Sequence, residues 1–332
     1  MKVVLLFDLS SAPPLDQDYS SYLKDAGWRS EMAVKRAIES VGHEAIFVGV
    51  YDNIPRLIQE LTELKPDLVF NMAESFRNNR HFEPQIAGVL ELLNLPFTGT
   101  GSFGLGLCKD KSLTKKILGH HKIPVPHSEV SKLSRPLRSL KKFSFPAFVK
   151  LVKSEASEGI SLDSFVEDEE QCLARADYLH KRFKEDVLIE EFILGRDIYV
   201  SVLGNKRLQV LPFRQLQFSR KEADGSQFAT YKTKWDEAYR KRWGVKNTFA
   251  PELSDAVLES ACEISKKAFE ALNLSGFARF DFRLTDKDAL VMLEANPNPS
   301  ISDDDDFVLS AKKAGLTFNE LIEKIMDIGW AR

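Results

Sequence analysis

Strand and helix signals alternate through the first hundred residues, and this alternation constrains the fold more than any other feature. Short apolar runs predict strands at residues 2–7, 44–50 and 67–71. Amphipathic stretches predict helices at residues 29–41, 54–64 and 84–92. Strands that alternate with helices form parallel sheets covered on both faces. We therefore expect an open α/β sheet here, interrupted by a polar segment over residues 8–28.

Length, charge and cysteine content narrow the class of protein. The 332 residues suffice for two or three domains, and 46 basic against 49 acidic residues give a net charge of −3. That balance creates no positive field for nucleic acid. Cys108, Cys172 and Cys262 are too widely spaced for a disulfide framework or a zinc site. The first apolar run is too short for a membrane span and is followed by no cleavage site. We therefore expect a cytoplasmic protein without a membrane partner.

The rest of the chain also mixes strands and helices. Apolar runs predict strands at residues 145–151, 160–165 and 187–193. Amphipathic stretches predict helices at residues 111–118, 169–183, 254–272 and 318–328. The region that follows residue 193, up to residue 234, is rich in strand signals. The α/β character therefore extends over the whole chain.

A pair of acidic strands near residue 290 carries the strongest chemical signal. Asp281 lies in one apolar run, a second run covers residues 291–293, and Glu294 and Asn296 follow directly. Residues two apart on a strand point the same way, so Glu294 and Asn296 share a face that Asp281 can reach from a neighbouring strand. Two carboxylates and an amide oxygen suit Mg²⁺. An edge hairpin with merely solvated acids remains an alternative.

Seven segments then follow in the order of a known enzyme family. They are residues 90–99, 109–116, 145–150, 188–192, 276–281, 293–296 and 314–318. In their order and spacing they resemble the D-alanine–D-alanine ligases of the ATP-grasp class. The resemblance implies a three-part α/β architecture, with the nucleotide between the last two parts. We expect an N-terminal α/β domain, a central subdomain and a C-terminal catalytic subdomain over residues 1–105, 106–190 and 191–332.

The resemblance also implies an activity. Such ligases use ATP to convert a carboxylate into an acyl phosphate, and an amine then displaces phosphate to form an amide. We expect ATP and two Mg²⁺ ions as cofactors, with Mn²⁺ able to substitute. The expected partners are a small carboxylate donor, an amine acceptor and a second copy of the chain, which would form a homodimer through the N-terminal domain.

Single residues take roles from the same resemblance. The residues expected to bind ATP are Lys111, Lys150, Ser157, Glu190, Glu191, Phe192, Ile193, Asp197, Phe228, Lys234 and Leu293. We expect Asp281, Glu294 and Asn296 to bind magnesium. Those expected to act on the reacting groups are Arg279, Lys234 and Ser300. Cationic side chains fit these roles because phosphoryl transfer depends on positioning and charge neutralisation.

Plainer interpretations of several of these residues stay open. Lys111 can be a solvated lysine at a helix start, and Lys150 can extend its ammonium from an apolar strand to water. The apolar residues of the nucleotide site can be ordinary core residues. Arg279 can serve only to pair with Asp281, two residues along the same strand.

Two departures from the family bear on the product. Ala156 stands where those ligases have a catalytic serine, and Trp235 stands where they have a tyrosine. An indole offers one N–H donor and no acceptor, so it cannot replace a phenol. We therefore expect an amide product other than D-alanyl-D-alanine. A D-alanine–D-alanine ligase with an altered donor site and a non-catalytic ATP-binding protein are the alternatives.

Two acidic segments bear on the substrates. We expect residues 8–28 to fold over the donor pocket, with Asp16 or Asp18 holding the donor's amino group. Four consecutive aspartates at residues 303–306 occupy the place where the family grips the acceptor's carboxylate. Aspartates repel a carboxylate and attract a cation, so we expect Asp304 and Asp305 to favour a cationic acceptor. A solvated acidic turn is the alternative.

Overall fold

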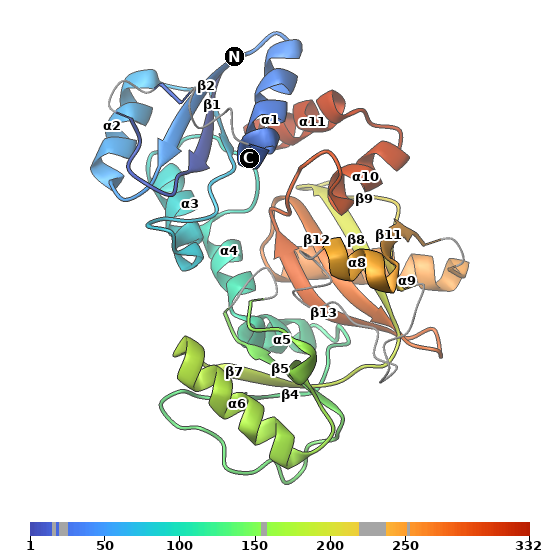
Figure 1. The fold of residues 1–332 in the computed structure, drawn as a ribbon. Helices are drawn as coiled ribbons and strands as arrows, with labels where there is room; N and C mark the ends of the chain where they lie inside the picture. Colours follow the sequence, from blue (N-terminus) through green and yellow to red (C-terminus); the bar gives the residue numbers. More distant parts are fainter. Residues whose placement is uncertain (15–17, 20–25, 154–157, 219–236, 251–252) are drawn as a thin grey trace.

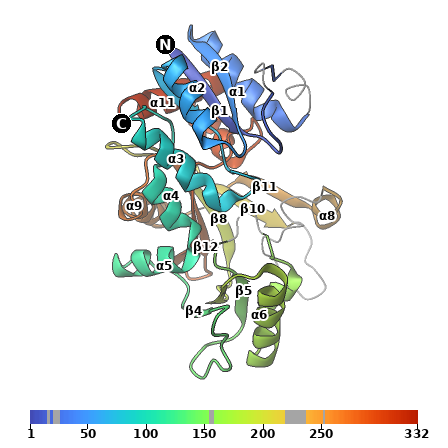
Figure 2. The same ribbon diagram turned by 90° about the vertical axis from the view of Figure 1, so that its left-hand side faces the viewer.

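Three sheets follow one another along the chain in the computed structural model, and Figures 1 and 2 show them as three groups of strands. The structure describes residues 1–14, 18–19, 26–153, 158–218, 237–250 and 253–332. None of the helices in these ranges combines the length and the apolar content needed to cross a membrane.

The first sheet is parallel, with the strand order β2-β1-β3. Its strands are β1 (Lys2–Asp8), β2 (Glu44–Val50) and β3 (Leu68–Asn71). The surrounding helices are α1 (Arg29–Ser40), α2 (Ile54–Leu64), α3 (Glu83–Leu92) and the short η1 (Ala26–Trp28) and η2 (Arg80–Phe82). Val4 and Leu6 pack with residues of α2 and α3, whereas Leu5 and Phe7 pack with residues of α1. The predicted open α/β sheet is confirmed.

The second sheet is antiparallel, with the order β4-β7-β5-β6. Its strands are β4 (Ser128–Ser131), β5 (Ala147–Leu151), β6 (Phe165–Val166) and β7 (Val187–Glu191). Two helices, α4 (Ser102–Lys109) and α5 (Lys111–His120), lead into it, and α6 (Glu169–Phe183) covers one face. The strand predicted over residues 160–165 is wrong, because Leu162–Ser164 forms the short helix η3 with hydrogen bonds between Ser161 and Ser164. Only Phe165–Val166 is extended there.

The third sheet is antiparallel, with the order β11-β10-β8-β12-β13, and β9 also pairs with β8. Its strands are β8 (Arg196–Gly204), β9 (Gln209–Val210), β10 (Arg214–Phe218), β11 (Val245–Phe249), β12 (Gly276–Leu284) and β13 (Leu290–Pro297). The helices of this region are α8 (Glu237–Trp243), α9 (Asp255–Ala271), α10 (Asp306–Lys313) and α11 (Phe318–Trp330).

The two faces of this third sheet differ in character because successive residues of a strand point to opposite sides. Val200 and Phe280 are paired in register and pack into a core cluster with residues of α9. The residues directly before and after these two point to the opposite face, which carries Tyr199 on β8 and Arg279 and Asp281 on β12. This second face is polar, and the candidate site lies on it.

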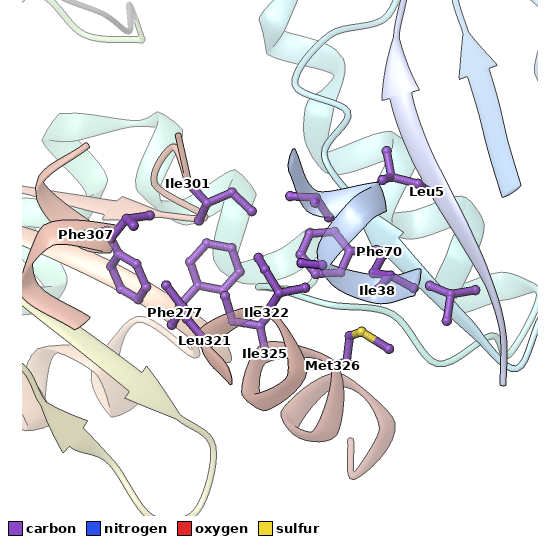
Figure 3. Close-up of a cluster of buried hydrophobic side chains, with 14 of the residues drawn as sticks. Leu5, Ile38, Phe70, Phe277, Ile301, Phe307, Leu321, Ile322, Ile325 and Met326 are labelled. Carbon is purple, nitrogen blue, oxygen red and sulfur yellow. The ribbon is translucent and has the colours of Figure 1, made fainter. Parts of the chain in front are cut away.

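The last helix, α11, joins the first and third sheets in one core. Its residues Ile322 and Met326 belong to the same buried cluster as Leu5 of β1, Phe70 of β3 and Phe277 of β12 (Figure 3). A 3.6-residue period puts the buried positions of α11 on one stripe that faces this cluster. The helix therefore fixes the first sheet against the third.

Candidate active site

The β12–β13 hairpin brings the three predicted magnesium ligands together. Asp281 lies opposite Glu294, and Arg279 lies opposite Asn296. The register shifts between Asp281 and Phe282, which leaves Leu293 as the extra residue of a β-bulge. The expected pairing of the two acidic strands is thus present, and their carboxylates share one face.

Asp281 and Arg279 form a two-pronged ion pair. The Nε and Nη2 atoms of Arg279 lie 2.7 and 2.9 Å from the two carboxylate oxygens of Asp281. The guanidinium also lies over the Tyr199 ring, 5.1 Å from its centroid. Burial lowers the pKa of Arg279, but Asp281 more than offsets this, so the group stays charged. Pairing with Asp281, the plainer interpretation, is therefore present in the structure, and the role of Arg279 on substrate stays a prediction.

A donor set suited to magnesium is present on this face. Asp281 and Glu294 offer carboxylates with partly exposed side chains, and Asn296, two residues after Glu294 on the same strand face, offers an amide oxygen. No group of three or more His, Cys, Asp or Glu that could hold a metal occurs in the described part of the chain. Two carboxylates and one amide leave coordination positions for phosphate and water, as Mg²⁺ prefers. The residues therefore fit the ion.

The amino-terminal end of α5 reaches the same hairpin. Asp110 caps this helix by accepting a hydrogen bond from the Leu113 amide, and the Lys111 amide donates to the Val152 carbonyl. Nζ of Lys111 lies 3.3 Å from a carboxylate oxygen of Glu294. The helix thus presents a buried ammonium beside a predicted magnesium ligand, although its contact with phosphate stays a prediction.

A buried cluster of two lysines and one glutamate lies next to it. Nζ of Lys115 and Nζ of Lys150 each lie 2.9 Å from a different carboxylate oxygen of Glu190. Burial alone raises the pKa of Glu190, but the two ammonium groups reverse this, and the net shift is downward. Burial lowers the pKa of Lys150, and Glu190 more than compensates, so its net shift is upward. The carboxylate is therefore held ionised.

Lys115 lies within residues 109–116, one of the segments that carry the family resemblance, but the resemblance gave it no role. It lies four residues after Lys111, so a helical period places both lysines on one face of α5. Besides Glu190, its Nζ donates to the carbonyl of Leu293, the bulge residue of β13, at 3.0 Å. That spacing was the signal that could have identified Lys115 as a site residue.

The other predicted nucleotide residues surround the end of β7. Glu191 follows Glu190 and so points to the opposite face, where it lines an open hollow of about 630 Å³ beside β4. The Phe192 ring packs against Phe165 at 4.8 Å between centroids. Asp197 is buried, and its carboxylate lies 3.3 Å from Nη2 of Arg283. Burial raises the pKa of Asp197, and the charge of Arg283 offsets part of that increase. Ile193 is partly buried. Their contacts with ATP stay predictions.

Several predicted residues fall outside the residues that the structure describes. They are Asp16, Ala156, Ser157, Phe228, Lys234 and Trp235. Asp18 is described and exposed, and its neighbour Tyr19 is buried, with the Gly49 amide donating to its hydroxyl. The fold of residues 8–28 over a donor pocket is therefore still a prediction.

A cavity of about 270 Å³ opens where β1 and β3 end. Its lining includes Asp8 after β1, Trp28 and Glu31 at the start of α1, and Ser300 of the loop after β13. In α/β sheets, ligands bind outside the carboxyl ends of the strands, which is where this cavity lies. Ser300, predicted to act on the reacting groups, thus lines a cavity shared by the first and third sheets.

Glu31 is a cavity residue that sequence reasoning missed. One of its carboxylate oxygens is buried without a hydrogen-bond partner among the described residues. Burial raises the pKa of Glu31, and the nearby carboxylates of Asp8 and Glu74 raise it further, although a backbone hydrogen bond opposes them. An acid in the first turn of a helix is usual, so the sequence held no signal for this role.

The acidic run at residues 303–306 is mostly engaged within the protein. Asp303 pairs with Lys312 at 2.6 Å, and Asp305 accepts a hydrogen bond from the Ser302 amide at 3.1 Å. Asp306 begins α10 and lies 3.0 Å from Nε of Arg214. Asp304 is exposed. The run is therefore the start of a helix with internal contacts, and its predicted contact with an acceptor is untested.

The three consecutive sheets and the lysines that meet a carboxylate-bearing hairpin define the architecture of an ATP-grasp ligase. A solved D-alanine–D-alanine ligase from Bacillus anthracis, complexed with ATP, matches the structure with a TM-score of 0.75 and 19% identity. The match covers 100% of this chain and 98% of that one. The VanG D-Ala:D-Ser ligase from Enterococcus faecalis matches with a TM-score of 0.72 and 18% identity, covering 99% of both chains. These similarities show a shared fold.

Sequence comparison extends the agreement to the family. Residues 125–327 match the family described as D-ala D-ala ligase C-terminus, so the chain belongs to the D-alanine–D-alanine ligase family and is an ATP-grasp carbon–nitrogen ligase. A D-alanine–D-alanine ligase of Desulforudis audaxviator is 28% identical over 312 residues, or 93% of this chain and 95% of that protein. An uncharacterised protein of Sinorhizobium fredii is 26% identical over 305 residues, covering 90% and 87% of the two chains.

Proposed function

We propose that this protein joins a small carboxylate donor to an amine acceptor at the expense of ATP, and that its product is not D-alanyl-D-alanine. The observation that carries the proposal is the hairpin face with Arg279, Asp281 and Glu294, which lies against the lysines of α5. A face with cations, carboxylates and an adjoining cavity suits a reaction in which phosphate charge develops beside a bound carboxylate.

Lys111 and Lys150 are proposed to neutralise the phosphates of ATP, and Lys234 is proposed to join them. Glu190 accepts a hydrogen bond from the 6-amino group of adenine, since an ionised carboxylate is purely an acceptor. Its two oxygens have four lone-pair positions, and the two lysines leave some of them for the base. Ile193 and Leu293 pack against the ring, and Asp197 holds the ribose.

Asp281, Glu294 and Asn296 are proposed to hold Mg²⁺, which when bound polarises the phosphate oxygens and neutralises their charge. Two ions, with Mn²⁺ as a substitute, remain part of this proposal. Arg279 then stabilises the charge on the acyl phosphate and on the tetrahedral intermediate. The Ser300 amide donates to the developing oxyanion beside the cavity.

The donor is proposed to occupy the 270 Å³ cavity at the ends of β1 and β3. Glu31 supports this placement, because its buried oxygen lacks a partner among the described residues and suits the donor's ammonium group. The acceptor is proposed to be cationic. Exposed Asp304 supports this choice, although its neighbours are engaged within the protein.

The organisation of the protein is proposed from the same family resemblance. The three parts are residues 1–105, 106–190 and 191–332, and the N-terminal part joins two copies into a homodimer. The location proposed for the enzyme is the cytoplasm, where ATP and amino acids are available.

The test measures ADP and phosphate release with pools of amino acids and amines, followed by mass spectrometry of the product. The proposal expects release that depends on both a carboxylate and an amine, with an amide of their summed mass less water. If ATP binds and no pool triggers release, the protein is a non-catalytic nucleotide-binding member of the family. If D-alanine alone triggers full release, the product assignment is wrong.

A further inference from the structure

Lys115 is a buried ammonium that contacts both the second and the third sheet. Its Nζ lies 2.9 Å from Glu190 on β7 and 3.0 Å from the Leu293 carbonyl on β13. The side chains of Lys115 and Glu190 are 5% and 4% exposed. One ammonium therefore joins the second sheet to the third at the place where they meet α5.

Both of its partners are groups that the proposed function assigns to the adenine ring. Glu190 meets the edge of the base, and Leu293 packs against its face. Leu293 is the bulge residue of β13, and a bulge interrupts the ladder, so its carbonyl accepts from the lysine instead. A bulge bends its strand and changes the direction in which a side chain points. The contact with Lys115 holds β13 in this bent conformation.

An ion pair with Lys150 alone does not fix Glu190 in the same way. Lys150 lies on β5 opposite Leu188, two residues before Glu190 on the neighbouring strand, and pairs with only one carboxylate oxygen. Lys115 reaches the other oxygen from α5, so the carboxylate is held from two directions. The Oε1 atom of Glu190 lies at ion-pair distance from Lys115 and accepts no hydrogen bond from the described residues, so its lone pairs are left for the base.

We propose that Lys115 is a positioning residue that makes the site selective for a purine with a 6-amino group. It acts through Glu190, which it holds toward that amino group, and through Leu293, whose backbone it supports beneath the ring. Hypoxanthine, the base of ITP, carries a carbonyl in place of the amino group. This carbonyl and the Glu190 carboxylate are both hydrogen-bond acceptors, so no hydrogen bond forms between them. The inference rests on the proposed nucleotide site, and it assigns to Lys115 a role that a merely stabilising ion pair would not have.

Calorimetric titration with MgATP and MgITP tests this without any knowledge of the amino-acid substrates. Hydrogen bonds to charged groups are strong enough for the wild type to prefer ATP by about tenfold to a hundredfold. Lys115→Met removes the ammonium and keeps an unbranched side chain. It should weaken ATP binding about tenfold or more, weaken ITP binding less because ITP loses only the support of Leu293, and bring the ratio close to one.

Lys109→Met is the matched control. Lys109 is a similarly buried lysine on α4, with Nζ 2.7 Å from Glu83 on α3, and both helices lie before the second sheet. The control breaks an ion pair of the same kind without removing a contact to Glu190 or Leu293. The ratio of ATP to ITP affinity should therefore stay at the wild-type value.

A double-mutant cycle separates positioning from stability. In a Glu190→Gln background, adding Lys115→Met should change the ratio no further, because the residue through which Lys115 acts is already altered. The double variant leaves no half-paired buried carboxylate, so this comparison stands even if Lys115→Met alone fails to fold. Thermal unfolding of every variant accompanies the titrations.

The outcomes are distinguishable. Wild-type protein that binds no MgATP overturns the nucleotide site and this inference together. Wild-type protein that prefers ATP, with a Lys115→Met variant that keeps the preference, overturns the inference alone. So does a further change of the ratio when Lys115→Met is added to Glu190→Gln, or an equal loss of ATP and ITP affinity in the single variant.

Discussion

At the scale of single residues, the site is governed by how buried charges are matched. Glu190 is ionised because two ammonium groups outweigh its desolvation, and Arg279 stays charged because Asp281 outweighs its burial. Glu31 is the contrasting case, since its neighbours Asp8 and Glu74 are acids and its pKa is raised. Matched groups lie around Glu190 and on the hairpin face, and the mismatched group lines the cavity at the ends of β1 and β3.

The Glu294→Gln variant should lose turnover and keep its fold. The change removes one of the two carboxylates proposed for Mg²⁺ but keeps a hydrogen-bonding group beside Lys111. Metal ions supply several kcal/mol of charge stabilisation in such reactions, so ADP release should fall by more than about a hundredfold. Near-wild-type release with a cognate substrate pair, in a variant with an unchanged circular dichroism spectrum, would refute the assignment.

The Glu31→Gln variant should be more stable than the wild type at neutral pH. Because burial raises the folded-state pKa of Glu31, protonation favours the folded state. That stabilisation is fully present below the unfolded-state value of 4.5 and is lost as the pH rises through the folded-state pKa. The glutamine of the variant is neutral at every pH, so the variant does not lose stability in this way. Between pH 4 and pH 8, the difference in melting temperature between the variant and the wild type should narrow as the pH falls. A difference that does not change with pH would contradict this explanation.

At the scale of elements, the strands and helices that the sequence predicted correctly are those with a clear period of apolar residues. The strands at residues 2–7 and 44–50 and the helix over 169–183 were readable because apolar residues recur with a clear period. The acidic hairpin was readable because its alternation fixes which side chains share a face. Nothing in the sequence pattern revealed that Leu293 lies in a bulge, because a bulge depends on the partner strand.

The elements that were missed lack such a pattern. Strand β4 (Ser128–Ser131) is short and polar, and it is extended because it pairs with β7. Helix α10 begins at the acidic run that suggested a loop, because Asp306 meets Arg214 from a distant strand. Long-range pairing decided both cases, and local propensity could not show it. The contacts of Lys115 and Glu31 with distant residues were hidden for the same reason.

The Asp306→Asn variant should loosen the start of α10. Its carboxylate accepts from Nε of Arg214 at 3.0 Å and from the Asn247 side chain at 2.7 Å, and Arg214 is buried. The substitution leaves Arg214 without its carboxylate partner, so the free energy of unfolding, measured by urea denaturation, should fall by about 3 kcal/mol. Asp304→Asn, at an exposed position, is the control and should change the free energy of unfolding by less than about 0.5 kcal/mol. Equal effects at the two positions would show that Asp306 contributes no special anchor.

At the scale of the whole molecule, the proposed site draws on residues from all three sheets. Lys115 lies on α5, Glu190 on the second sheet and Glu294 on the third, and the adjoining cavity reaches the first sheet through Asp8. Such a site depends on how the three sheets are held together. The family resemblance predicted this arrangement, whereas composition and periodicity alone gave only the α/β class.

The wild-type enzyme should form little or no D-alanyl-D-alanine. By the family resemblance, Ala156 and Trp235 stand where those ligases have a serine and a tyrosine, and an indole offers no acceptor in place of a phenol. With D-alanine alone at millimolar concentration and MgATP, chromatography should detect less than about a hundredth of the dipeptide made by a D-alanine–D-alanine ligase under the same conditions. Robust dipeptide formation would instead identify a D-alanine–D-alanine ligase with an altered donor site.

The position of α11 also has a consequence for how the protein is made. Helix α11 (Phe318–Trp330) packs in one core with β1 (Lys2–Asp8). A ribosome synthesises β1 and α1 first and α11 much later, so the part of this face that α11 covers stays exposed for most of translation. Exposed apolar surface and long-range contacts of this kind slow folding and favour aggregation. We therefore expect the nascent chain to be prone to aggregation until residues 318–330 have emerged.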